Sequence, residues 1–419
     1  MLLRLKIKTV IDWLLIGYLV TLIFLYPYGL PLLGKNNLRV SDLLALPLIF
    51  LCLVVLSKTK CIKDYPVLNS FVLAFIAFEL CYPILGLFSG YEGLGAISNT
   101  LRMALIWLPF LLYIHVSESE KADSLDGLLN NLLKISILIN LVYGLMQIAS
   151  RLGVVSPSFL ITKHMIPFAV DEHFRVTDGI RASGFFVNTT GLSVFAILTM
   201  TYFLARFIGK QRSWDALFIL VSFVTVVITT SRAAVLTACL TLFLGWIFFG
   251  KRHKIYTGLV FLSFAVLALV LIDHFIGLDV LFGRFFRLLE GGASDKSFSA
   301  RSGRIWPKVF QKLEPYEYGT LVNAVSKVGL VDSGYLTYYA QGKWPFIVVL
   351  VLMLVGSFIK SVNLFINRDN WGLFLVMGTV VYLGFTMVVL NPIRSPFAIF
   401  FLLFGLWLSE TYAIRNAKN

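Results

Sequence analysis

The chain has 419 residues, of which 58% are hydrophobic and 14% are charged, and its mean hydropathy is +0.85. A water-soluble chain of this length cannot bury so much apolar surface in one core, so the composition excludes a soluble globular protein. On a soluble protein the formal net charge of +14 would suggest nucleic-acid binding. In a membrane protein basic residues have other uses, and no nucleic-acid partner is expected.

Long apolar stretches recur along the chain without the alternation of outer-membrane strands. In lipid the backbone must satisfy its own hydrogen bonds, so these stretches are predicted to be helices. No small-residue cleavage site follows the first stretch, which therefore predicts a retained helix rather than a signal peptide. The sequence predicts an all-α polytopic integral membrane protein, a single membrane domain with about twelve spans. The predicted spans lie near residues 10–28, 41–57, 66–88, 99–116, 127–150, 185–208, 215–230, 233–249, 255–276, 343–364, 371–390 and 395–412.

Three short connections between the predicted spans are basic, and the positive-inside rule assigns them to the cytoplasm. The basic N-terminus then lies on the same side, and an even number of spans returns the C-terminus to it. The opposite, outer face carries two long loops, near residues 151–184 and 277–342. The basic connections contain Lys58, Lys60 and Lys63, then Arg206, Lys210 and Arg212, then Lys251, Arg252 and Lys254.

The outer loops are also basic, and the positive-inside rule does not explain this because long loops are translocated regardless of charge. In the loop 277–342, eight lysines and arginines stand against six acidic residues. A basic outer face suits an anionic ligand such as phosphate or pyrophosphate; the alternative is contact with lipid headgroups and solvent. The two halves of the chain show no internal repeat, which a transporter built from repeats would more often show.

The first outer loop ends in the segment Arg181-Ala-Ser-Gly184-Phe-Phe-Val-Asn188, which leads into the sixth predicted span. Gly184 allows a close approach of the backbone. Asn188, or Thr189 after it, can cap the following helix, whose N-terminus favours an anion. The segment is therefore a candidate anion site, with Arg181 as its cation.

A second arginine, Arg232, lies in the turn between the seventh and eighth predicted spans, in Thr229-Thr-Ser231-Arg232. This turn is so short that the charge lies at the membrane boundary or inside it. Charges at that depth are costly and tend to face a cavity and bind something, which makes Arg232 a second candidate. The alternative is an arginine that snorkels to the headgroups.

The second outer loop contains two arginines, Arg301 and Arg304, ahead of Trp306 and Pro307. Pro307 suits the first turn of a helix, and the two arginines would lie beside the positive end of that helix and grip a diphosphate. The alternative is a peripheral amphipathic helix with interfacial arginines. The apolar stripe of this helix would lie on the bilayer and contain Ile305, Trp306, Val309, Phe310 and Leu313.

Two further outer segments carry candidate residues. Arg394 lies in a tight turn between the last two predicted spans, where it can assist anion binding. Asp332 precedes an aromatic run that begins at Tyr335, and it can either accept a proton from a sugar hydroxyl or cap the next helix. The tyrosines can stack on sugars or belong to the interfacial aromatic belt.

These segments, in this order, resemble the superfamily of O-antigen ligases and Wzy-type O-antigen or capsule polymerases, which have a GT-C-like membrane fold. The matching segments are Arg181-Ala-Ser-Gly-Phe with Asn188, Thr-Ser231-Arg232-Ala, Arg304-x-Trp306, and Asp332-Ser-Gly-Tyr335-Leu ahead of Gly342. Ligases of the superfamily typically carry a His-Asn-like pair before Tyr-Leu. Here those places read Ser333-Gly334, which favours a polymerase.

The resemblance implies an enzyme of the bacterial inner membrane that acts on its periplasmic face without a metal or cofactor. It implies transfer of a growing glycan from undecaprenyl pyrophosphate to the non-reducing end of a new lipid-linked repeat unit. Arg181, Arg232 and Arg304 would then hold the pyrophosphate, and Asp332 would be the base. The expected substrate contacts are Arg301, Arg394, Trp306, Asn188 and Tyr335.

Other functions stay open at this level. An O-antigen ligase would pass the finished polymer to lipid A-core, and a flippase or other transporter would move a polyprenyl-linked oligosaccharide across the membrane. An assembly scaffold without chemistry is the third alternative. For the polymerase, the expected partners are the lipid-linked oligosaccharide, membrane lipids and, as a candidate, a chain-length regulator protein.

Overall fold

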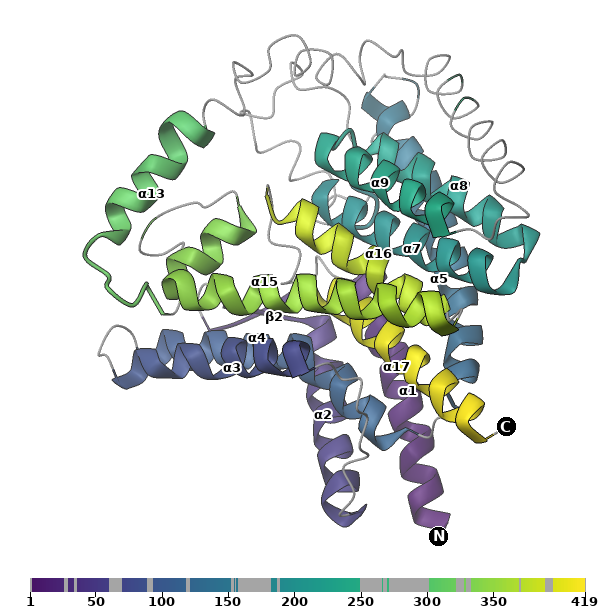
Figure 1. Ribbon diagram of the computed structural model, residues 1–419, viewed down its shortest axis with the longest axis horizontal. Helices are drawn as coiled ribbons and strands as arrows, with labels where there is room; N and C mark the ends of the chain where they lie inside the picture. The colour runs from purple at the N-terminus through teal and green to yellow at the C-terminus, as the bar shows by residue number, and fades with distance from the viewer. Residues whose placement is uncertain are drawn as a thin grey trace. The chain divides into compact units, whose positions relative to one another are not determined.

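The computed structural model describes residues 2–25, 29–33, 36–59, 70–88, 93–117, 121–151, 154, 156, 182–186, 189–248, 266, 270, 301–321, 328, 333–368, 371–388 and 395–418. These residues are mainly helical (Figure 1). The helices are α1 (Leu2–Phe24), α2 (Val40–Thr59), α3 (Ser70–Phe88), α4 (Gly93–Val116), α5 (Lys121–Arg151), α7 (Thr189–Lys210), α8 (Ser213–Ile228), α9 (Arg232–Phe248), η4 (Arg301–Ile305), α13 (Trp306–Leu313), α15 (Gly334–Arg368), α16 (Trp371–Thr386) and α17 (Pro396–Lys418).

The predicted apolar runs coincide with helices, to within a few residues at their ends, in the part of the chain that the structure describes. Eleven of the twelve fall on the helices α1 to α5, α7 to α9 and α15 to α17, and the run 255–276 lies outside the described residues except for two positions. Within the described part of the chain, five helices are long and apolar enough to cross a membrane, and six more are apolar but shorter. Length and composition therefore indicate a membrane protein.

Two short strands accompany the helices. β1 (Gly29–Leu33) and β2 (Asn36–Arg39) form an antiparallel hairpin between α1 and α2, and the register shifts between Pro31 and Leu33. A proline has no backbone N–H for the ladder, which explains why the irregularity lies beside Pro31.

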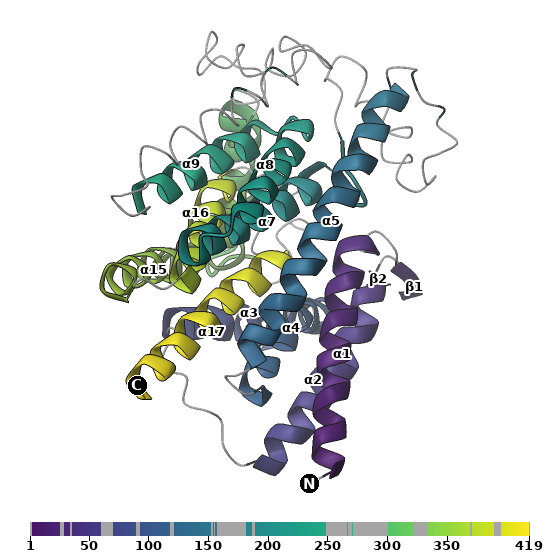
Figure 2. The same ribbon diagram turned by 90° about the vertical axis from the view of Figure 1, so that its right-hand side faces the viewer.

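Contacts among the described residues divide the chain into two compact units. Unit 1 consists of residues 1–19, 41–124 and 293–419, and unit 2 consists of residues 20–40 and 125–292. In unit 1, α15 packs on α3 and α16, and α17 packs on α16 and α4. In unit 2, the helices α7, α8 and α9 lie side by side, as both views show (Figures 1 and 2).

A buried network of charges joins three helices of unit 2. The Asp126 carboxylate of α5 accepts hydrogen bonds from Arg206 and Lys210 of α7 and from the Tyr202 hydroxyl. Arg206 also lies 3.5 Å from Asp215 of α8, measured from Nε to Oδ2. The side chains of Arg206, Asp126 and Asp215 are 2%, 4% and 0% exposed, so each charge depends on its partners.

Helix α15 begins earlier than the sequence predicts. The predicted span starts at residue 343, whereas the structure is helical from Gly334 and breaks the helix at Gly342 and Lys343. Lys343 has a φ of 52°, and Pro345 stands in the first turn after the break, where a proline is tolerated. Pro345 therefore marks the kink inside α15 and not the start of the helix.

Breaking the charge network should destabilise unit 2. Replacing Asp126 with asparagine leaves Arg206 and Lys210 without their shared counter-charge inside the protein. We expect Asp126→Asn to lower the free energy of unfolding by about 3 kcal/mol, as for other broken buried ion pairs. An unfolding titration with sodium dodecyl sulfate in mixed micelles measures this loss. Asp123→Asn, on the exposed side of the same helix, is the control, and equal midpoints for the two variants would contradict the prediction.

Candidate functional site

The segment 182–186, which follows the predicted candidate Arg181, is a non-helical turn held by two amide side chains of α5. The N–H groups of Ser183 and Gly184 donate to Gln147 Oε1 at 2.9 and 3.0 Å. Gln147 Nε2 donates to Ser183 Oγ at 3.3 Å and to the Gly184 carbonyl at 3.2 Å. The Phe185 N–H donates to Asn140 Oδ1 at 3.0 Å. We call this arrangement the amide clamp: Asn140 and Gln147 with the segment 182–186.

The amide clamp is buried and closely packed. Ala182, Ser183, Asn140 and Gln147 are all buried, and the Phe185 ring stacks on Tyr143 with centroids 4.4 Å apart. Asn140, Tyr143 and Gln147 recur at intervals of three and four residues, so they share one face of α5. One helix face therefore supplies both the hydrogen bonds and the apolar contact that hold the turn.

A backbone hydrogen bond connects the turn to the end of α8. The Ala182 N–H donates to the Ile228 carbonyl at 3.0 Å. After Ile228 the chain makes a tight turn in which Thr230 has a φ of 52°, and α9 begins at Arg232. The structure thus joins the segment that follows Arg181 to the turn that precedes Arg232. Of Arg232 only the backbone is described, at the first residue of α9.

Two glycines allow this close packing. Gly184 has a φ of +57°, and a Cβ there would lie 2.5 Å from Asn140 Oδ1. A Cβ at Gly144 of α5 would lie 2.8 Å from Ile228 Cδ1 and 3.1 Å from the Ala182 Cβ. A side chain at either position would push the turn away from α5 or from α8.

In unit 1, Arg301 and Arg304 lie in the π-helical turn η4, which continues directly into α13. Both arginines thus precede α13, as the sequence predicts, and the π-helical turn joins them to that helix. Arg304 is exposed and Arg301 is half-buried. Pro307 lies in the first turn of α13, where the sequence analysis placed it.

The apolar stripe of α13 packs mainly on protein. Val309 and Leu313 are buried in one cluster with Leu336 and Ala340 of α15, and Trp306 packs against this cluster. The prediction that the whole stripe lies on the bilayer was therefore wrong for its centre. At its edge Phe310 is half-exposed and meets the Tyr339 ring edge-to-face.

The start of α15 is fixed to the end of α16. Ser333 caps α15, since its Oγ accepts a hydrogen bond from the Leu336 N–H at 3.4 Å, and the same hydroxyl donates to the Met387 carbonyl. The Gly334 N–H also donates to the Met387 carbonyl, at 2.8 Å. Ser333 thus takes the capping role that the sequence analysis left open for Asp332.

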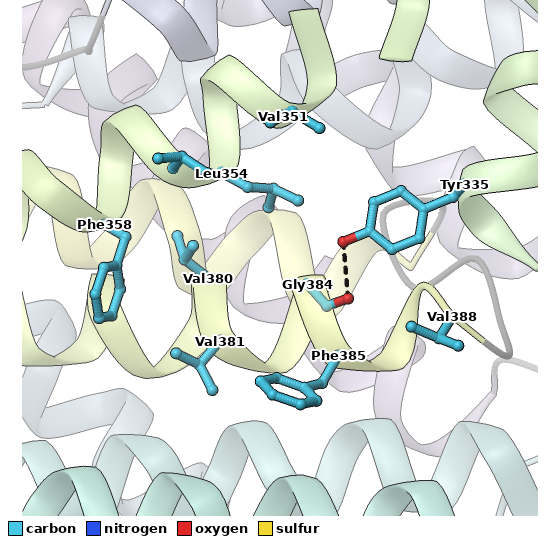
Figure 3. A pocket seen from close by; sticks show the side chains of 10 residues that line it. Tyr335, Val351, Leu354, Phe358, Val380, Val381, Gly384, Phe385 and Val388 are labelled. Carbon is cyan, nitrogen blue, oxygen red and sulfur yellow. Dashed lines mark hydrogen bonds between the residues drawn. The ribbon is translucent and has the colours of Figure 1, made fainter. Parts of the chain in front are cut away.

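An apolar groove of about 430 Å³ runs between α15 and α16 (Figure 3). Phe358 lies at one end of it and Tyr335 at the other, where the Tyr335 hydroxyl donates to the Gly384 carbonyl at 2.8 Å. Val355 and Phe385 on its walls are half-exposed. The groove therefore offers apolar surface along the helices and one polar group at the start of α15.

The predicted site residues fall into three groups. Arg181, Asn188, Asp332 and Arg394 lie outside the described residues. In unit 1 the structure brings Trp306, on the helix that follows Arg301 and Arg304, against the start of α15, which carries Tyr335. In unit 2 the structure describes the backbone of Arg232, at the first residue of α9.

No family model matches the sequence, and no curated protein matches it. The superfamily that the motifs resemble therefore stays a prediction. Among the residues that the structure describes, no group of three His, Cys, Asp or Glu side chains is placed to hold a metal ion.

Sequence reasoning missed Asn140 and Gln147. The available signal was two amides seven residues apart on one face of an apolar helix. Amide side chains inside a membrane helix need partners, and their common face points to a single partner segment.

The amide clamp predicts a strong effect of one methyl group. Gly184→Ala adds a Cβ that collides with Asn140 Oδ1 and requires an unfavourable positive φ, so we expect a destabilisation of about 1–3 kcal/mol. Gly127→Ala is the matched control, because a Cβ at this helical position in α5 meets nothing within 4 Å. Thermal unfolding in detergent compares the two variants. The clamp would be refuted if Gly184→Ala unfolded at the same temperature as Gly127→Ala or above it.

Proposed function

We propose that this protein is a membrane glycosyltransferase that polymerises lipid-linked oligosaccharide repeat units. The growing glycan is transferred from undecaprenyl pyrophosphate to the non-reducing end of a new undecaprenyl-pyrophosphate-linked unit. The protein belongs in the bacterial inner membrane, with about twelve spans, both termini in the cytoplasm and the active site on the periplasmic face. A GT-C-like fold and a chain-length regulator as a partner are parts of the same proposal.

The hydrogen bond from Ala182 to Ile228 carries this proposal. It supports the view that the two arginine-containing segments of unit 2 act together, because it lies one residue after Arg181 and four residues before Arg232. Two cations at one end of a group of apolar helices suit a ligand that is anionic at its head and apolar behind it.

In the proposed reaction the main task of the protein is to stabilise the negative charge that develops on the leaving pyrophosphate. A hydroxyl of the acceptor sugar attacks the anomeric carbon of the donor, and the bond from that carbon to the pyrophosphate oxygen breaks. The leaving undecaprenyl pyrophosphate takes the electron pair, and its negative charge rises in the transition state. Arg181, Arg232 and Arg304 stabilise this charge in the proposal, and Asp332 accepts the hydroxyl proton.

Unit 1 supports the proposal through the start of α15. One side of this helix contacts α13, which follows Arg301 and Arg304 in the chain, and Tyr335 of the same turn lines the apolar groove. The groove suits an isoprenoid chain, since its walls are apolar and half-exposed. Trp306 and Tyr335 are then candidate substrate contacts beside the cationic segment.

The proposal predicts a loss of activity when single arginines are removed. Purified wild-type protein should extend synthetic lipid-linked repeats into a ladder of products. Arg232→Ala and Arg304→Ala should lower this rate about 100-fold, the typical cost of one lost charge-stabilising donor. Arg212→Ala, an exposed arginine in the turn between α7 and α8, is the control. Full ladders from folded Arg232→Ala and Arg304→Ala would contradict the roles of these residues.

If the groove holds the isoprenoid chain, filling the groove should raise the KM for the lipid-linked substrate. A Cβ at Gly384 meets only the Tyr335 hydroxyl, at 3.8 Å, so Gly384→Leu fills the groove without a backbone clash. We expect the KM for undecaprenyl-linked repeats to rise about tenfold, as if about two buried CH₂ groups were lost at about 0.8 kcal/mol each.

A donor with a shortened isoprenoid chain separates this effect from general damage, because its KM should not change in Gly384→Leu. Gly127→Leu adds the same side chain where a Cβ meets open space. If the KM values for both donors rise equally in Gly384→Leu, the groove does not hold the chain.

A further inference from the structure

The amide clamp makes more contacts than a connecting loop requires. Gln147 alone takes part in four hydrogen bonds with Ser183 and Gly184, and Asn140 adds a bond from Phe185. In the connection between α7 and α8, by contrast, backbone groups make the turn bonds: the Gln211 N–H donates to the Phe207 carbonyl at 3.1 Å, and the Asp215 N–H donates to the Arg212 carbonyl at 3.0 Å. The bonds of the clamp are therefore a specific feature of the turn 182–186.

These bonds fix the direction of the chain on both sides of the turn. Its N-terminal residue, Ala182, is tied to Ile228, and Phe186 donates to the Ser183 carbonyl at 3.0 Å, which closes the turn before α7 begins. A Cβ at Gly144 of α5 would collide with both Ile228 and Ala182, so the lack of a side chain at Gly144 lets α5 approach both residues closely. A shift of the turn would move the chain at Ala182 relative to Ile228 and the residues that lead to Arg232.

We infer that Asn140 and Gln147 are positioning residues that set the pyrophosphate affinity of unit 2, an inference that rests on the proposed function. We place neither side chain in contact with the substrate. Both are buried. The hydrogen bonds of Gln147 go to the turn, whereas Asn140 accepts one from the turn and donates one to the Ser136 carbonyl of its own helix. They act through the geometry of the chain that bears Arg181 and of the turn that leads to Arg232.

Near-isosteric apolar replacements test the inference. Gln147→Met removes four hydrogen bonds at nearly constant volume. Asn140→Leu removes the bond from Phe185 and the bond to the Ser136 carbonyl within α5. Thr201→Val is the matched control: Thr201 is a buried residue of α7 whose hydroxyl donates to the Ile197 carbonyl of its own helix. Ser183→Ala is a graded variant that removes one Gln147 bond and keeps the other three.

Two readouts are measured on purified protein in detergent: the affinity for inorganic pyrophosphate by calorimetry, and the kcat and KM for lipid-linked repeats. In Gln147→Met we expect the pyrophosphate affinity to fall about tenfold and kcat/KM about 100-fold, the scale of a misplacement by about 1 Å. Ser183→Ala and Thr201→Val should stay within about twofold of the wild type. If Gln147→Met does not fold, Asn140→Leu must show the same loss in affinity.

If Asn140 and Gln147 had a purely structural role, their variants would unfold at a lower temperature, but the folded fraction would bind pyrophosphate as tightly as Thr201→Val does. This result would overturn the inference. A wild-type protein that binds no pyrophosphate would also overturn it. A wild-type protein that binds pyrophosphate with the expected pattern among the variants, but does not extend lipid-linked repeats, would support the positioning role and reject the polymerase. The two failures are therefore distinguishable.

Discussion

A buried stretch of chain that is not helical must find partners for its peptide groups inside the protein, most of all where lipid replaces water. The turn 182–186 meets this constraint with side chains, because Gln147 and Asn140 of α5 take the place of a regular hydrogen-bond ladder. Gly184 is the residue that lets the turn close against Asn140. The Ala182 N–H joins this turn to the Ile228 carbonyl at the end of α8, four residues before Arg232.

The two polar features of unit 2 lie at opposite ends of α5. Asp126, in the charge network, and Gln147, in the amide clamp, are 21 residues apart on this helix, since 147 − 126 = 21. At 1.5 Å per residue this is about 30 Å, close to the thickness of the hydrocarbon core of a bilayer. The helix between them therefore fits a membrane-spanning position with the charge network at one boundary and the amide clamp at the other. In the proposed topology the charge network would lie at the cytoplasmic boundary, the side to which the positive-inside rule assigns Arg206 and Lys210.

Continuous apolar runs and their length were sufficient to predict the long helices, because the signal for such a helix lies within its own segment of the sequence. Pro307 likewise predicted the start of α13. The turn at Gly184, the cap at Ser333 and the partners of Gln147 could not be read in this way, because they depend on contacts between residues far apart in the chain. Within the candidate site, the sequence indicated which arginine segments to consider, and the structure showed how Ala182 joins two of them.

We propose that an arginine-based site at the outer boundary transfers a glycan from a pyrophosphate carrier. The decisive measurement uses purified protein in proteoliposomes supplied with synthetic undecaprenyl-pyrophosphate-linked repeats, in which polymer linkages and released undecaprenyl pyrophosphate are counted together. We expect one released carrier for each linkage formed. Repeats that cross the bilayer without any increase in length or release of carrier would contradict it and indicate a transporter.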